Sequence, residues 1–345
     1  MGDTVSVSCP HVVYLGGFGR SGSTLLERIL GAVPGWVNVG ELVDLPRSVY
    51  PHRELCGCGE RFTDCPFWSR VGQDAFGGWS DETLARLAGL RLDVARQRQV
   101  PQLLRLARGG APGSELARRV AAYQEGYGRI YRAVARAAGA TVVVDASKGP
   151  AHGLALGLSL PHGPGKGYTL GMVNLVRDPR GVAYSWSRRQ VERPQSGTDP
   201  RPMWSISASR SAAQWAALQT EMALIGSVAG VPTRRLRYED LVARPRRAVL
   251  ELVHGLGLPL PDGGLDHVGE HAVTLAASHG LSGNPSRFRH GRIELSADVE
   301  WQRAMPARDR RVVTTATLPW LMAYGYPPAR PRGTEPHTSS RAERG

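Results

Sequence analysis

The sequence predicts a single α/β domain, a mostly parallel β-sheet flanked by helices. Short, almost continuous apolar runs alternate along the chain with longer segments of helical spacing, a pattern typical of β-α-β units. The 345 residues are enough to bury a large core. A hydrophobic content of 41% and a charged content of 21% are ordinary for a globular protein.

The first strand is predicted at residues 11–17, because HVVYLGG is the apolar pattern of a strand buried on both faces. The glycine-rich run GGFGRSGST follows at residues 16–24 and leads into a segment of helical spacing that ends at GAVPG. A second short strand is predicted at residues 36–40, directly before Glu41.

A helical insertion is predicted at about residues 80–138, with the flexible connection RGGAPGS inside it. The domain is placed at residues 10–326. Residues 327–345, rich in Pro, Ser, Thr and charge, are expected to form a disordered tail. The remaining elements continue the alternation, with strands predicted at 140–147, 168–178 and 233–240 and helices at about 207–229 and 243–256.

The formal net charge of +13 is carried almost wholly by arginine, since Lys148 and Lys166 are the only lysines. A small anionic cofactor or an acidic substrate explains this charge at least as well as nucleic acid does, and no nucleic-acid partner is expected. No stretch reaches the ~18 apolar residues of a membrane span. The N-terminal MGDTVSVSC lacks the basic and apolar regions of a secretory signal, so a cytoplasmic protein is expected.

Three of the four cysteines lie in the run CGCGERFTDC: Cys56, Cys58 and Cys65. In a reducing compartment this clustering indicates a metal site or free thiols rather than disulfides. The C-x-C-x6-C spacing is not a standard zinc spacing, and the fourth ligand would have to be Cys9, His11 or His52. The alternative, which we favour, is a glycine-rich surface loop with small buried thiols.

The glycine-rich run predicts an anion-binding loop. A buried strand, a tight turn and a helix start place several backbone N–H groups around one point, at the positive end of a helix dipole. Glycines at 17, 19 and 22 permit the backbone conformations that this requires. The polar side chains available to a phosphate are Arg20, Ser21, Ser23 and Thr24. Because Ser23 replaces the lysine of a Walker A loop, an ATPase or kinase is the weaker interpretation.

A second motif, LVRDPRGVAYSWS, covers residues 175–187. It places Arg177 at the end of a predicted strand and Ser185 about two turns into the helix that Pro179 begins. Ligands of parallel sheets bind at the carboxyl ends of the strands. Arg177 and Ser185 are therefore predicted to hold an anion near the glycine-rich loop.

Together these two motifs resemble the sulfotransferases that use 3′-phosphoadenosine 5′-phosphosulfate (PAPS), in a bacterial branch close to the Golgi-type enzymes. GFGRSGSTLL resembles their 5′-phosphosulfate loop and LVRDPRGVAYSWS their 3′-phosphate motif. Further segments fit in the family's order over roughly residues 11–325: VGEL (39–42), CGCGERFTDCPFW (56–68), VVDASK (143–148), RYEDL (237–241) and SGNPSRFR (282–289).

The resemblance implies a P-loop-like sheet and transfer of a sulfonate from PAPS to a hydroxyl of a small-molecule, lipid or sugar acceptor. The product is 3′-phosphoadenosine 5′-phosphate (PAP), and no metal is required. The implied PAPS contacts are Gly19, Arg20, Ser21, Gly22, Ser23 and Thr24 at the phosphosulfate, Arg177 and Ser185 at the 3′-phosphate, Tyr238 near the adenine, and Ser282, Gly283, Asn284 and Arg287 closing over the 3′-phosphate.

The resemblance also implies the catalytic residues. Glu41 is the expected base, because the Golgi-like branch uses a glutamate and Glu41 ends the second predicted strand. The chain lacks the Lys-Thr-His run of the cytosolic branch, and His152 is the rival base. Arg20 replaces the lysine of that branch, and Lys148 is a point charge for the sulfonate. Asp145 is expected to orient a neighbour. The acceptor pocket is expected from the helical insertion and from aromatic side chains at Tyr184, Trp186 and Trp204.

Two other functions remain as alternatives. A nucleotide or small-molecule kinase would require Mg²⁺. A non-catalytic protein that binds polyanions would show steep salt dependence and no preference for PAP.

Overall fold

The computed structural model describes residues 9–110, 113–160, 165–188, 192–193, 201–202 and 205–327. Its centre is a five-stranded, wholly parallel sheet with the strand order β2-β3-β1-β4-β7. The strands are β1 (His11–Gly17), β2 (Trp36–Gly40), β3 (Val142–Lys148), β4 (Thr169–Val176) and β7 (Thr233–Arg237). The predicted fold class, a P-loop-like parallel sheet flanked by helices, is confirmed.

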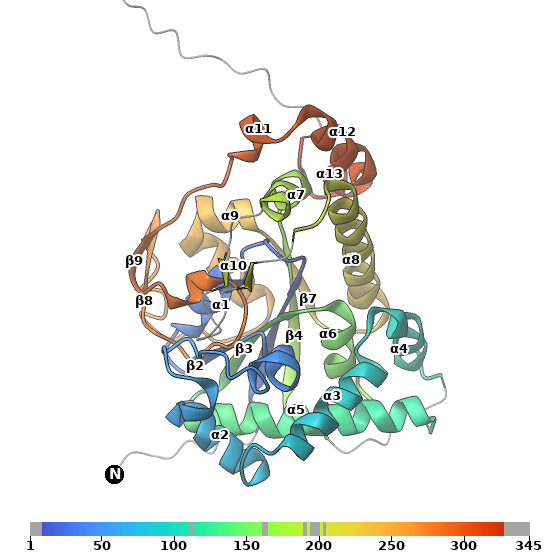
Figure 1. The fold of residues 1–345 in the computed structure, drawn as a ribbon, viewed down its shortest axis with the longest axis vertical. Coiled ribbons are helices and arrows are strands. Elements are labelled where there is room, and N and C mark those ends of the chain that lie inside the picture. The colour runs from blue at the N-terminus through green and yellow to red at the C-terminus, as the bar shows by residue number, and fades with distance from the viewer. Residues whose placement is uncertain are drawn as a thin grey trace, which may run out of the picture.

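Helices cover both faces of the sheet (Figure 1). Residues of β1 alternate between the two cores: Val13 and Leu15 pack with α1 (Ser23–Gly31), α9 (Tyr238–Ala243) and α10 (Pro245–Gly255). Val12 and Tyr14 pack on the other face, with α5 (Glu115–Ala138), α6 (Pro150–Gly157) and α8 (Ala208–Val228). A strand buried on both faces explains the almost continuous apolar run in the sequence.

The region predicted as a helical insertion contains α3 (Asp81–Val94), α4 (Val100–Ala107) and α5. Helix α2 (Pro66–Phe76), which the sequence analysis did not predict, packs against α5. Serine side chains cap the first turns of three long helices: Ser80 of α3, Ser114 of α5 and Ser207 of α8. Among the described residues, no helix is both long enough and apolar enough to cross a membrane.

The strand predicted at 233–240 ends early, at Arg237, and Tyr238 begins α9. Elements after α10 were not predicted, because their apolar residues are few and lack a clear period. The remaining elements are short: the hairpin β8 (Ala272–Leu275) and β9 (Gly291–Glu294), the pair β5 (Glu192–Arg193) and β6 (Arg201–Pro202), helices α7 (Pro179–Ser187), α11 (Trp301–Ala304), α12 (Ala307–Ala316) and α13 (Leu318–Ala323), and single turns η1 (Leu42–Asp44), η2 (Leu45–Val49), η3 (Phe62–Asp64), η4 (Gln97–Gln99) and η5 (Pro285–Phe288). The predicted tail lies outside the described residues from 328 onward.

Candidate functional site

The carboxyl ends of all five parallel strands meet at one cavity of about 420 Å³, a volume typical of small-molecule sites. The glycine-rich loop follows β1, Glu41 follows β2, Lys148 ends β3, Arg177 follows β4 and Tyr238 follows β7. The predicted site residues that line the cavity are Gly19, Arg20, Gly22, Ser23, Thr24, Glu41, Lys148, Arg177, Ser185, Tyr238, Ser282, Gly283 and Asn284.

The glycine-rich loop lies against two aromatic rings. Gly22 has a φ of 91°, and a Cβ there would lie 2.6 Å from the Tyr238 ring. A Cβ at Gly19 would lie 2.6 Å from the Trp186 ring, so any side chain at either position requires the ring to move. Arg20 has a φ of 73°, uncommon for a residue with a side chain, and its guanidinium lies 5.3 Å from the Trp186 ring centroid.

Helix α1 begins at the cavity with Ser23 and Thr24 in its first turn. Within the part of the chain that the structure describes, no side chain caps this end and no acidic residue lies in the first turn. The first backbone N–H groups are therefore available to an anion, at the positive end of the helix dipole. Ser21, within the loop, is buried and does not line the cavity.

Glu41 and Lys148 form an ion pair across the ends of β2 and β3, with Lys148 Nζ donating to Glu41 Oε1. Both side chains are about one-fifth exposed. The backbone N–H of Glu41 donates to Leu281 O at 2.8 Å, so the same strand end also holds the segment at 280–284.

Asp145 is buried behind this pair. Its carboxylate accepts hydrogen bonds from Tyr131 Oη at 2.6 Å and from Ser147 N at 2.9 Å, and Ser147 Oγ accepts one from Val43 N at 3.0 Å. Burial raises the pKa of Asp145 to about 6. The hydrogen bonds link the ends of β3 and β2, the geometry expected of a residue that orients its neighbours.

Arg177 lies beneath the glycine-rich loop and is buried. Its Nη1 donates to Arg20 O at 2.9 Å and its Nη2 donates to Asp298 Oδ2 at 2.7 Å. The guanidinium also lies 4.7 Å from the Tyr238 ring centroid. Asp298 is 121 residues away in the sequence, and no motif predicted this pairing.

The 282–284 loop closes one side of the cavity. Ser282 Oγ donates to Asp44 Oδ2 at 2.9 Å, and Asn284 Oδ1 accepts from Ser286 N at 2.9 Å. Gly283 has a φ of 85°, and a Cβ there would lie 2.9 Å from Glu41 Oε1. The loop is therefore packed directly on the carboxylate of Glu41.

Besides Ser21, Arg287 and His152 lie away from the cavity lining. Arg287 is 1% exposed, and its Nη2 donates to Leu55 O at 3.0 Å, so it lies behind the loop rather than in the cavity. We do not retain it as a PAPS contact. His152, the rival base, is buried among tyrosines with its Nδ1 2.6 Å from Tyr123 Oη, and burial lowers its pKa to about 3. His152 does not line the cavity. Trp204, expected at the acceptor pocket, lies outside the described residues.

Sequence reasoning missed two carboxylates near the site besides Asp298. Asp44 accepts the hydrogen bond of Ser282. Glu27 is buried on α1, and burial raises its pKa to about 8. A signal for Glu27 existed, since it is a charged residue inside the apolar run LLERIL.

A second cavity of about 460 Å³ borders the first at Tyr238. Its lining includes Arg180, Arg237 and Trp301 but not the glycine-rich loop, Glu41 or Lys148. Glu41, able to act as a base, and Lys148, its cationic partner, therefore lie in the smaller cavity.

The clustered cysteines lie apart from this lining, beside a histidine that was not predicted. Cys56 and Cys65 are buried, and their thiols and that of Cys58 face His279. This agrees with the favoured expectation of a surface loop with small buried thiols, since Cys56 and Cys65 are buried while Gly59, Glu60 and Arg61 between them are exposed. The expected fourth ligands are wrong: Cys9 is exposed, His11 Nδ1 bonds Thr169 Oγ1 at 2.7 Å, and neither these residues nor His52 belongs to the cluster.

The family model described as "Sulfotransferase family" matches residues 10–262. A search of curated proteins found no match. Among solved structures, the sulfotransferase domain from the Synechococcus PCC 7002 olefin synthase is 18% identical, with a TM-score of 0.45, and the alignment covers 93% of this chain and 98% of that one.

Two further structures are similar. The sulfotransferase domain from the curacin biosynthetic pathway is 15% identical, with a TM-score of 0.45 and coverage of 89% of this chain and 98% of that one. Sulfotransferase STF1 from Mycobacterium tuberculosis H37Rv is 16% identical, with a TM-score of 0.36 and coverage of 76% and 72%. Likenesses this weak identify no substrate.

The family match covers most of the chain, so the protein belongs to the sulfotransferase family. It is a transferase of a family that transfers sulfonate groups.

Proposed function

We propose that the protein is a PAPS-dependent O-sulfotransferase that transfers the sulfonate to a hydroxyl of a small-molecule, lipid or sugar acceptor and releases PAP. The observation that carries this proposal is the meeting of five strand ends at one cavity. There the glycine-rich loop and Arg177 provide two anion positions, and the Glu41–Lys148 pair lies beside them.

The first anion position suits the 5′-phosphosulfate. It combines the uncapped start of α1, the hydroxyls of Ser23 and Thr24, and the guanidinium of Arg20. A sulfonate has less charge than a γ-phosphoryl group, so these donors suffice without the Walker lysine.

The second anion position suits the 3′-phosphate, the group that distinguishes PAP from ADP. Arg177 and Ser185 line the same cavity, and Arg177 already holds one anion, the carboxylate of Asp298. A bound phosphate takes the place of that carboxylate, because a guanidinium binds either group through paired N–H donors.

Glu41 is the proposed base. As the acceptor oxygen forms its bond to sulfur and the bond from sulfur to the PAP oxygen breaks, the Glu41 carboxylate takes the hydroxyl proton. Lys148 and Arg20 stabilise the negative charge on the transferring group and on the leaving oxygen. Lys148 also orients the carboxylate, since the two side chains are paired.

The proposal is tested by thermal shift with PAP, PAPS, ADP and ATP, each with and without Mg²⁺. A ligand at a hundredfold excess over its Kd stabilises a protein by about 2.7 kcal/mol. PAP and PAPS should therefore raise the Tm clearly without metal, and ADP much less. Arg177→Gln should remove the advantage of PAP over ADP. Arg188→Gln is the matched control, because Arg188 follows α7 but is exposed and paired with Glu300.

Three outcomes contradict the proposal. Equal shifts for PAP and ADP remove the role of Arg177 and Ser185. A large shift with ATP that needs Mg²⁺ indicates a kinase. Stabilisation by any polyanion that disappears with added salt indicates a non-catalytic binder.

A further inference from the structure

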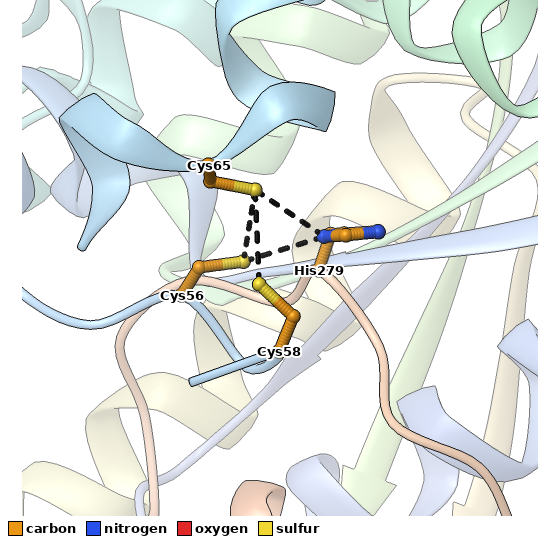
Figure 2. A group of neighbouring side chains, drawn as sticks. All are labelled: Cys56, Cys58, Cys65 and His279. Atoms are coloured by element: carbon orange, nitrogen blue, oxygen red, sulfur yellow. Dashed lines mark hydrogen bonds between the residues drawn. The ribbon is translucent and has the colours of Figure 1, made fainter. Parts of the chain in front are cut away.

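Four soft side chains converge outside the cavity. Cys56 and Cys58 lie on the loop before η3, Cys65 directly precedes α2, and His279 comes from the segment between β8 and η5. Figure 2 shows all four side chains pointing toward one another. Their ligand atoms all lie within 4.8 Å of one another, although 223 residues separate Cys56 from His279.

Four of the six distances among these atoms match the edges of a zinc tetrahedron. With Zn–S bonds of about 2.3 Å and a Zn–N bond of about 2.05 Å, a regular tetrahedron has S···S edges of about 3.8 Å and S···N edges of about 3.6 Å. Cys65 Sγ lies 3.8 Å from both Cys56 Sγ and Cys58 Sγ. His279 Nδ1 lies 3.6 Å from Cys56 Sγ and 3.4 Å from Cys65 Sγ.

The surroundings hold the ligands in place. The His279 ring stacks on Phe67, with centroids 4.5 Å apart and an interplanar angle of 7°. His279 O accepts a hydrogen bond from Trp68 Nε1 at 2.9 Å. Cys65 directly precedes the first turn of α2, whose positive end favours a thiolate.

The local charge also suits a metal. One Zn²⁺ with three thiolates and a neutral imidazole has a net charge of −1. The guanidinium of Arg287 is buried close by, donating to the carbonyl of Leu55, the residue before Cys56. This residue, which lies outside the PAPS cavity, provides a cation beside the cluster.

We propose that Cys56, Cys58, Cys65 and His279 bind one zinc ion. Three sulfurs and one nitrogen complete a tetrahedron and leave no open position, so the site is structural rather than catalytic. Binding displaces the thiol protons to solvent, and the reaction involves no oxidant.

The ion ties the cysteine loop to the segment that leads into the cavity. Gly57 N donates to Gly280 O at 3.0 Å, and Leu281 N donates to Val39 O at 2.9 Å, at the end of β2. His279 is three residues before Ser282, which lines the cavity. Zinc therefore holds the 282–284 loop in position without touching the reacting atoms.

The test measures metal in the full-length, untagged protein, purified without chelator and analysed by inductively coupled plasma mass spectrometry. We expect about one zinc per chain, as for a closed structural site. Cys65→Ser and His279→Asn should reduce it severalfold or more, since each removes one of four ligands. Cys9→Ser and His254→Asn are the matched controls, because Cys9 and His254 are exposed and outside the cluster, and both should keep their zinc.

A second measurement uses only the wild-type chain, in case the ligand variants fail to fold. Exchange of zinc for Co²⁺ should produce visible bands of tetrahedral cobalt and thiolate-to-cobalt charge transfer. Wild-type protein without stoichiometric metal overturns the proposal, whether thiol titration then finds a disulfide or four free thiols. Zinc that persists in Cys65→Ser and His279→Asn, or cobalt without the thiolate bands, overturns it as well.

Discussion

The cavity and the cysteine cluster differ in how their polar groups are arranged. At the cavity, charged groups pair with one another. Glu41 pairs with Lys148, and both line the cavity, while Arg177, which also lines it, pairs with Asp298 of the adjoining second cavity. In the cluster, three thiol groups and one imidazole face one another, and the thiols of Cys56 and Cys65 are buried. In an open site, a charged ligand can replace one member of an ion pair, which suits binding and turnover. A closed group of metal ligands suits stability instead.

This difference separates the expected effects of mutation. Substitutions in the cavity should change turnover or ligand affinity with little change in Tm. Substitutions in the cluster should first change metal content and stability.

The largest effect is expected for Glu41→Gln, which keeps size and hydrogen bonding but removes basicity. Turnover should fall by about 10²–10⁴-fold, the usual contribution of general-base catalysis, while PAP affinity and Tm stay near wild type. The loss should be larger for aliphatic alcohols than for acidic phenols, whose protons leave more easily. The measurement is PAP release from PAPS with a panel of alcohol and phenol acceptors.

His152→Ala is the comparison for that experiment. Because His152 is buried in the core and away from the cavity lining, its loss should lower the Tm more than the turnover of the folded enzyme. If His152→Ala abolishes turnover while Glu41→Gln retains it, the assignment of the base is wrong.

An intermediate effect is expected for Arg20→Ala. Loss of a charge-assisted contact costs about 1.5–3 kcal/mol, which corresponds to roughly a ten- to a hundredfold weaker PAP affinity. Isothermal titration calorimetry with PAP measures this affinity for the wild type and for Arg20→Ala. Arg47→Ala is the control, because Arg47 is exposed, pairs with Asp44 and does not line the cavity. Equal affinities for the wild type and Arg20→Ala would place Arg20 outside the phosphosulfate position.

The smallest effect is a gain, expected for Asp298→Asn. Removing the carboxylate that occupies Arg177 frees the guanidinium for the 3′-phosphate. A partly exposed ion pair contributes up to about 1 kcal/mol, so PAP should bind roughly two- to fivefold more tightly. The affinity for ADP, which has no 3′-phosphate, should not change. Titrations of wild type and Asp298→Asn with PAP and with ADP measure both affinities. An equal gain for both ligands would indicate a general charge effect instead.

Most cavity residues were predictable because each lies next to a strand that can be recognised locally. The run HVVYLGG identifies β1, so the glycine-rich loop after it must lie at a carboxyl end of the sheet. The same argument locates Glu41 after β2 and Arg177 after β4. Tyr238 was placed in a strand but begins a helix, which did not change its position at the sheet edge.

The side chains whose direction the sequence could not determine share a physical cause. Arg287 follows Ser282, Gly283 and Asn284 by only a few residues, but its side chain turns into the core toward Leu55 rather than into the cavity. Sequence adjacency limits where a backbone atom lies, not the side to which a side chain points in an irregular loop. His152 likewise follows Lys148 closely, yet it lies in a helix that packs into the aromatic core.

The sequence by itself determined the α/β class, the strand ends that carry the anion-binding groups, and the three clustered cysteines, because strand patterns and short motifs are local. Only the tertiary structure decided which distant residues complete each site. His279 joins cysteines more than 200 residues earlier, and Asp298 meets Arg177 across 121 residues. Those partners come from the region after α10, where local periodicity is weak and the packing of loops against the strand ends sets the geometry.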